Sequence, residues 1–191
     1  MDEEEGLIKE CLVTSGATAP FPDLIKSALS DASLQAFASH GFTHITYQCG
    51  ESLGVYEEWK PKNSYGLVLR AFDFNTKGLS EEMRRCQASS VSRRGLVICH
   101  AGAGTVLEAL RYGVPIIVVP NNSLLECHQE ELAEELERQG YATKSGVVDL
   151  SEAIRKAYVK EIKAWTGKNA SLAPIINDVI GYEEDIKAHL D

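Results

Sequence analysis

The four residues Ile116-Ile117-Val118-Val119 are apolar at every position. A strand covered on one face alternates apolar and polar residues, whereas an uninterrupted apolar run is typical of a strand covered on both faces. Strands of that kind belong to parallel sheets that carry helices on each side. The run therefore predicts an α/β protein in which this segment is buried.

Other β-rich segments alternate with segments of helical spacing, which predicts a Rossmann-like parallel sheet with helices on both faces. Residues 51–63 are expected to form a polar connection, Gly41 to end the first helix and Ser80 to cap the second. The expected strands are 11–14, 42–48, 66–72, 95–99 and 115–119, and the expected helices are 22–37, 80–92, 104–112, 123–139, 151–165 and 172–190.

The 191 residues contain no internal repeat or linker, so we expect residues 1–191 to form a single domain. Residues 1–9 begin with four acidic side chains and are expected to be frayed. Helix 172–190 either packs on the core or docks on a partner. Six glutamates between residues 126 and 137 are expected to form the solvated face of a helix.

Composition excludes several classes of protein. The net charge of -9 argues against a nucleic-acid partner. No apolar run approaches the ~20 residues that cross a bilayer, and the acidic start does not resemble a signal peptide. Five widely spaced cysteines without a CxxC pair argue against a disulfide framework or a metal site. We expect a cytoplasmic protein that binds no metal.

The segment 99–105, Cys-His-Ala-Gly-Ala-Gly-Thr, follows a predicted buried strand and opens a predicted helix. Its small residues would let a ligand approach the backbone, and the first N–H groups of the helix would face an anion. Glu108, one turn after Gly104, could accept hydrogen bonds from ribose hydroxyls. The alternative is a tight turn in which the glycines serve packing alone.

Two further loops are expected at the carboxyl ends of strands, where ligands of parallel sheets bind. Gly16 and Thr18 could hold a phosphate or form a plain turn. Asn122, His128 and Gln129 could hold sugar hydroxyls, although His128 alone is typical of an exposed helix residue. The chain contains neither the GxGxxG pattern after its first strand nor the GK[ST] of a P-loop.

Together these segments resemble the donor half of GT-B glycosyltransferases of the family 28 type, and in particular the cytosolic catalytic subunits of two-subunit dolichyl-diphosphate GlcNAc transferases. The similar segments are 13–18, 21–25, 97–110, 113–120 and 128–133. The resemblance covers residues 12–142. It implies a single lobe of the C-terminal GT-B type.

The resemblance implies a role for each matching residue. Glu108 would bind the ribose, His128 and Gln129 would contact the donor sugar, and Phe72 and Asp73 would lie beside the uracil. His100 is a candidate for the catalytic base, or it braces the loop. The residues implied to hold the UDP diphosphate are Gly16, Thr18, Gly102, Ala103, Gly104 and Thr105.

The implied reaction transfers GlcNAc with inversion from UDP-GlcNAc to GlcNAc-diphosphodolichol, without a metal. A membrane-anchored partner subunit would supply the acceptor lobe and hold this chain on the cytosolic face of the endoplasmic reticulum. The base could lie on that partner. Two rivals stay open: another UDP-sugar enzyme of the same fold, and a non-catalytic nucleotide-sugar-binding module.

Overall fold

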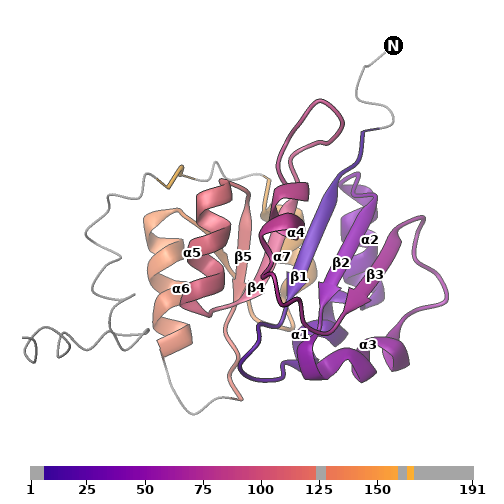
Figure 1. The fold of residues 1–191 in the computed structure, drawn as a ribbon, viewed down its shortest axis with the longest axis horizontal. Coiled ribbons are helices and arrows are strands. Elements are labelled where there is room, and N and C mark those ends of the chain that lie inside the picture. The colour runs from indigo at the N-terminus through magenta and orange to yellow at the C-terminus, as the bar shows by residue number, and fades with distance from the viewer. Residues whose placement is uncertain (1–6, 124–127, 159–162, 166–191) are drawn as a thin grey trace, which may run out of the picture.

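The computed structural model describes residues 7–123, 128–158 and 163–165. Six parallel strands form one sheet in the order β3-β2-β1-β4-β5-β6 (Figure 1). This is the strand order of the Rossmann fold, so the predicted fold class is confirmed. The strands are β1 Glu10–Thr14, β2 His44–Gln48, β3 Val68–Phe72, β4 Leu96–His100, β5 Ile116–Val119 and β6 Thr143–Lys144.

Helices cover both faces of the sheet, as predicted. On one face, α1 (Pro22–Ala28), α2 (Asp31–Ser39) and α7 (Leu150–Lys156) pack against Cys11 and Val13 of β1. On the other, α4 (Ser80–Arg85), α5 (Ala103–Tyr112) and α6 (His128–Gln139) pack against the intervening Leu12. All four residues of β5 are buried because the run contributes alternately to the two faces.

The helix expected at 22–37 is two helices, α1 and α2. The chain breaks at Leu29 and Ser30, and the Ser30 hydroxyl accepts a hydrogen bond from the N–H of Ser33, 3.3 Å away, to begin α2. Both helices place apolar residues on the core side. The helical spacing of apolar residues therefore continues across the break, and the sequence pattern does not reveal it. Gly41, with φ +70°, follows the end of α2 as predicted.

The polar connection expected at 51–63 is wrong in its first half. A 3₁₀ turn at Gly50–Ser52 leads into α3 (Leu53–Trp59). Tyr56 is the one residue of α3 that is buried, and its ring packs on Tyr47 with 5.3 Å between centroids. A helix that buries a single side chain leaves almost no apolar periodicity in the sequence.

Two other helices are shorter than expected. Helix α4 ends at Arg85, because Ser92 and Gln87 form a turn in which the Ser92 hydroxyl donates to the Gln87 carbonyl at 3.0 Å. Ser80 is the first residue of α4 and does not cap it. Helix α7 ends at Lys156, and residues 163–165 are not helical. Strand β6 was not predicted.

The expectation of frayed residues 1–9 is wrong for residues 7–9. Ile8 bridges to Ser92, and the backbone N–H of Lys9 donates to the Thr43 hydroxyl at 3.0 Å. The expected helix 172–190, and residues 124–127 of the expected helix 123–139, lie outside the described residues. Among the helices that the structure describes, none is long and apolar enough to cross a membrane.

Replacing Ser30 with alanine should destabilise the protein by about 1 kcal/mol, because α2 loses its N-terminal cap. Urea unfolding followed by circular dichroism would measure the change. Ser39→Ala, at the opposite end of α2, removes a hydroxyl that bonds back to the Ala36 carbonyl. That control should change the unfolding free energy by less than about 0.5 kcal/mol; equal effects would contradict the capping role.

Candidate functional site

The candidate site lies where β1 and β4 end side by side at the carboxyl edge of the sheet, the lower edge in Figure 1. After β1 the chain enters α1 on one face, and after β4 it enters α5 on the opposite face. The loops that follow these neighbouring strands therefore diverge. Ligands of open parallel sheets bind at such a point.

The His100 ring fills the space between the two loops. A Cβ atom built on Gly16 would lie 2.3 Å from Cε1 of His100, and one built on Gly102 would lie 2.1 Å from Nε2. Gly16 also has φ +81°, a conformation that other residues rarely adopt. A side chain at either position would therefore have to displace the His100 ring.

Burial lowers the pKa of His100, so the ring is uncharged at neutral pH. Its Nδ1 atom is buried and has no hydrogen-bond partner among the described residues. A neutral imidazole could accept a proton, but the enclosure of the ring between two backbone segments favours the bracing role over that of the catalytic base.

Gly104 differs from the other two glycines. A Cβ atom at this position would meet no heavy atom of the described residues within 4 Å. Gly104 is the second residue of α5, whose N-cap is Gly102 and lacks a capping side chain. Packing does not explain this glycine, whereas close approach of a ligand to the N-terminus of the helix does. Ala103 is buried, and Thr105 is half-buried in the same turn.

Glu108 is held in place by Ser80, which no motif in the sequence marks as a site residue. The Ser80 hydroxyl, at the start of α4, donates to Oε1 of Glu108. No hydrogen bond from the part of the chain that the structure describes engages Oε2. The carboxylate is therefore oriented, and one of its oxygens remains for a ligand.

The loop after β5 is organised by Asn121, whereas Asn122, the residue predicted to bind the donor, is exposed. Asn121 is 5% exposed, and its side-chain amide donates to the Pro20 carbonyl at 3.3 Å. Its backbone N–H donates to Oε1 of Gln129 at 2.9 Å. The Gln129 oxygen is thus used inside the protein, which leaves its amide hydrogens for a sugar.

His128 begins α6 and is half-buried, and its Nδ1 atom has no partner within the described residues. Thr18 lies exposed in the loop after β1. Phe72 ends β3, and the carbonyls of Phe72 and Asp73 accept hydrogen bonds from Cys49 and Gly50. The predicted donor-binding residues therefore all lie in segments at the carboxyl ends of strands.

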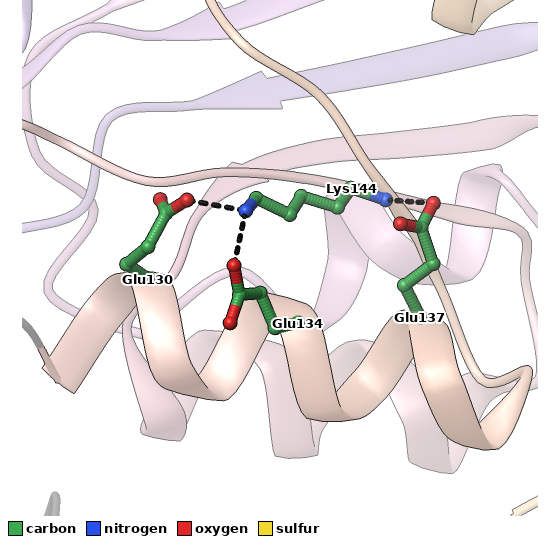
Figure 2. Close-up of polar contacts among 4 residues, drawn as sticks. All are labelled: Glu130, Glu134, Glu137 and Lys144. Carbon is green, nitrogen blue, oxygen red and sulfur yellow. Dashed lines mark hydrogen bonds and ion pairs between the residues drawn. The ribbon is translucent and has the colours of Figure 1, made fainter.

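Helix α6 is joined to the sheet by Lys144 of β6 (Figure 2). The Lys144 ammonium binds the carboxylates of Glu130 and Glu134, the latter at 3.0 Å, and its backbone N–H donates to Glu137 at 3.1 Å. The hydrogen bond to Glu130 raises the pKa of Lys144. The side chains of Glu130 and Glu134 remain 42% and 63% exposed, in keeping with the expected solvated face, and they also bind Lys144. They hold the helix that carries His128 and Gln129.

Among the described residues, no group of three or more His, Cys, Asp or Glu side chains could hold a metal ion. Cys11, Cys49, Cys86 and Cys99 are buried free thiols, and Cys127 lies outside the described residues.

The model of the glycosyltransferase family 28 C-terminal domain matches residues 10–173. The chain belongs to this family. That match covers most of the chain and contains every residue placed in the candidate site.

Several relatives in the family carry the name UDP-N-acetylglucosamine transferase subunit ALG13. The protein from Yarrowia lipolytica is 38% identical over 72% of this chain and 65% of its own length. The Saccharomyces cerevisiae protein is 31% identical over 84% of this chain and 91% of its own length. The human protein is 33% identical over 69% of this chain, but the match spans 11% of that protein. These relatives are named as subunits, so they belong to transferases of more than one chain.

Two solved structures have a similar fold. The NMR structure of ALG13 matches with a TM-score of 0.66 and 27% identity, over 91% of this chain and 98% of that one. The crystal structure of Acinetobacter baumannii MurG matches with a TM-score of 0.56 and 18% identity. That likeness covers 95% of this chain and 47% of MurG, so the fold corresponds to about half of that protein.

Replacing Gly104 with alanine should stabilise the protein by about 0.5–1 kcal/mol, because alanine favours the helix and meets no neighbour. The same methyl group should weaken UDP binding about 10-fold or more, because it occupies the space of the ligand. Thermal unfolding and calorimetric titration would measure the two effects.

Gly54→Ala is the matched control, because Gly54 lies in α3 and a Cβ atom there also meets nothing within 4 Å. It should stabilise the protein without changing the affinity for UDP. Unchanged UDP binding by Gly104→Ala would mean that no ligand approaches Gly104.

Replacing Lys144 with methionine should lower the melting temperature by about 2–4 °C, because Glu130 and Glu134 lose their shared cation and repel each other. The difference should shrink in 1 M salt, which screens the repulsion. Lys156→Met removes a single exposed pair with Glu152 in α7 and should have a smaller effect. A loss independent of salt would show that the Lys144 contacts are not electrostatic.

Proposed function

We propose that this chain is the donor-binding subunit of a transferase that moves GlcNAc from UDP-GlcNAc to GlcNAc-diphosphodolichol. The family and the names of the relatives support the donor and the sugar. The match to about half of MurG supports a chain that supplies one lobe of a two-lobed enzyme. A membrane-anchored partner subunit would supply the acceptor lobe and recruit this chain to the cytosolic face of the endoplasmic reticulum.

One observation carries the proposal. The first turn of α5 contains Gly104, which no contact among the described residues requires. The oriented carboxylate of Glu108 follows one turn later. An anionic group at Gly104 and a pair of vicinal hydroxyls at Glu108 together describe a nucleoside diphosphate. Gln129 and His128 lie at the head of the neighbouring helix, where a sugar joined to the diphosphate would extend.

The protein would assist the reaction by binding the leaving group. As the bond between sugar and diphosphate breaks, negative charge grows on UDP. The first N–H groups of α5 and the dipole of that helix would stabilise this charge without a metal ion. Inversion needs a base that takes the proton of the acceptor hydroxyl. The His100 ring is enclosed between two loops and so is poorly placed for that task, and we assign the base to the partner subunit.

Calorimetric titration of the chain with UDP and UDP-GlcNAc, in the presence of a metal chelator, tests the proposal. ADP-glucose and NAD serve as comparison ligands. We expect selective binding of the uridine nucleotides. Glu108→Gln should weaken UDP binding about 10-fold or more, because one hydrogen bond to a charged acceptor is lost.

Glu152→Gln, which removes a carboxylate from the exposed pair in α7, is the control and should bind UDP as the wild type does. Equal affinity of Glu108→Gln and wild type would remove Glu108 from the ribose site. A wild-type chain that binds no uridine nucleotide, alone or co-purified with its partner, would leave a scaffold role and overturn the proposal.

A further inference from the structure

Gln48 is the last residue of β2, and its side chain is enclosed at the carboxyl edge of the sheet with 3% of its surface exposed. Strand β2 lies between β1 and β3. The loops that follow those two strands are the ones implied to hold the diphosphate and the uracil. Gln48 therefore lies between two parts of the candidate site, although nothing in the sequence pattern assigns it a role.

The side-chain amide of Gln48 makes four hydrogen bonds to its surroundings. Its oxygen accepts from the Thr14 hydroxyl at 2.6 Å and from the N–H of Gly16 at 3.2 Å. Its NH₂ group donates to the carbonyl of Gly16 at 3.1 Å and to the carbonyl of Asp73 at 2.9 Å. Two donors and two acceptor positions are the full capacity of an amide.

These bonds fix the orientation of the two backbone polar groups of Gly16. Both the N–H and the carbonyl of Gly16 are engaged by Gln48, and the N–H also lies 3.1 Å from the Thr14 hydroxyl. The N–H of Gly16 is therefore not available to a phosphate. Since Gly16 in turn packs against His100, its position also affects the loop that precedes α5.

We propose that Gln48 is a positioning residue of the donor site. It ties the loop after β1 to the loop after β3 and so sets the separation between the diphosphate and the nucleobase of UDP. This inference rests on the proposed function, because it requires both loops to bind one nucleotide. Gln48 itself touches neither ligand group.

The contacts of the amide differ from those that hold the sheet together. Strands β1 and β2 are already joined by five paired residues, and the backbone carbonyl of Gln48 accepts from the N–H of Ser15 at 3.0 Å. The side chain adds bonds to Thr14 and to the loops beyond the strand ends. Loss of the amide would leave the carbonyls of Gly16 and Asp73 without this partner, so we expect both the melting temperature and the ligand affinity to fall.

Two variants separate the functions of the amide. Gln48→Met keeps the length of the side chain and removes all four hydrogen bonds. Gln48→Glu keeps the acceptor for Gly16 and Thr14, but it loses both donors and places a carboxylate beside the carbonyls of Gly16 and Asp73. Tyr47→Phe is the control, because it removes a buried hydroxyl of the same strand that bonds Ala28, away from the site.

Calorimetry with UDP gives the affinity and the fraction of chains that bind, and thermal unfolding gives stability. We expect Gln48→Met and Gln48→Glu to weaken UDP binding about 10-fold or more while the binding fraction stays near one. Tyr47→Phe should lower the melting temperature and leave the affinity unchanged. A merely structural role of Gln48 would reduce the melting temperature or the binding fraction without changing the affinity.

The outcomes distinguish this inference from the proposed function. Wild-type affinity for UDP in both Gln48 variants would overturn the positioning role and leave the donor site intact. Failure of the wild-type chain to bind UDP under any condition tested would overturn the proposed function, and the positioning role with it.

Discussion

Because all six strands run in the same direction, every strand ends at one edge of the sheet, and the polar backbone groups of the loops there must find partners. Side-chain amides supply many of these hydrogen-bond partners. Gln48 joins the loops after β1 and β3, Asn121 joins the loops after β1 and β5, and Gln129 binds the backbone of Asn121. The backbone groups that these three amides bind are therefore held in place before a ligand arrives, which lowers the entropic cost of binding.

The three glycines of the candidate site differ in what surrounds them. From sequence alone, Gly102 and Gly104 could serve ligand approach or packing, and Gly16 could hold a phosphate or form a plain turn. A Cβ atom on Gly16 or Gly102 would collide with the His100 ring, whereas one on Gly104 would meet no atom of the described residues within 4 Å. Packing therefore accounts for the first two glycines and leaves open space at the third.

The sheet and the place of the site could be predicted because they depend on patterns along the chain. The apolar run at 116–119 indicated burial on both faces, and the glycine segment after β4 indicated the site. Other features depend on single contacts between distant residues, which leave no periodicity. Ser80 reaches Glu108 from 28 positions away, and Gln48 reaches Gly16 from 32 positions away. Helix α3 was missed for a related reason, since it buries only Tyr56.

The edge strand β6 has a consequence for how this chain behaves among copies of itself. An open sheet presents unpaired backbone groups at its outer strands, and long, flat edges invite pairing between molecules. Strand β6 is two residues long, and one of them is Lys144, whose backbone N–H and ammonium are both bound by glutamates of α6. A neighbouring chain could therefore form almost no backbone hydrogen bonds with this strand. The contacts that hold α6 beside the donor site thus also protect this edge of the sheet from self-association.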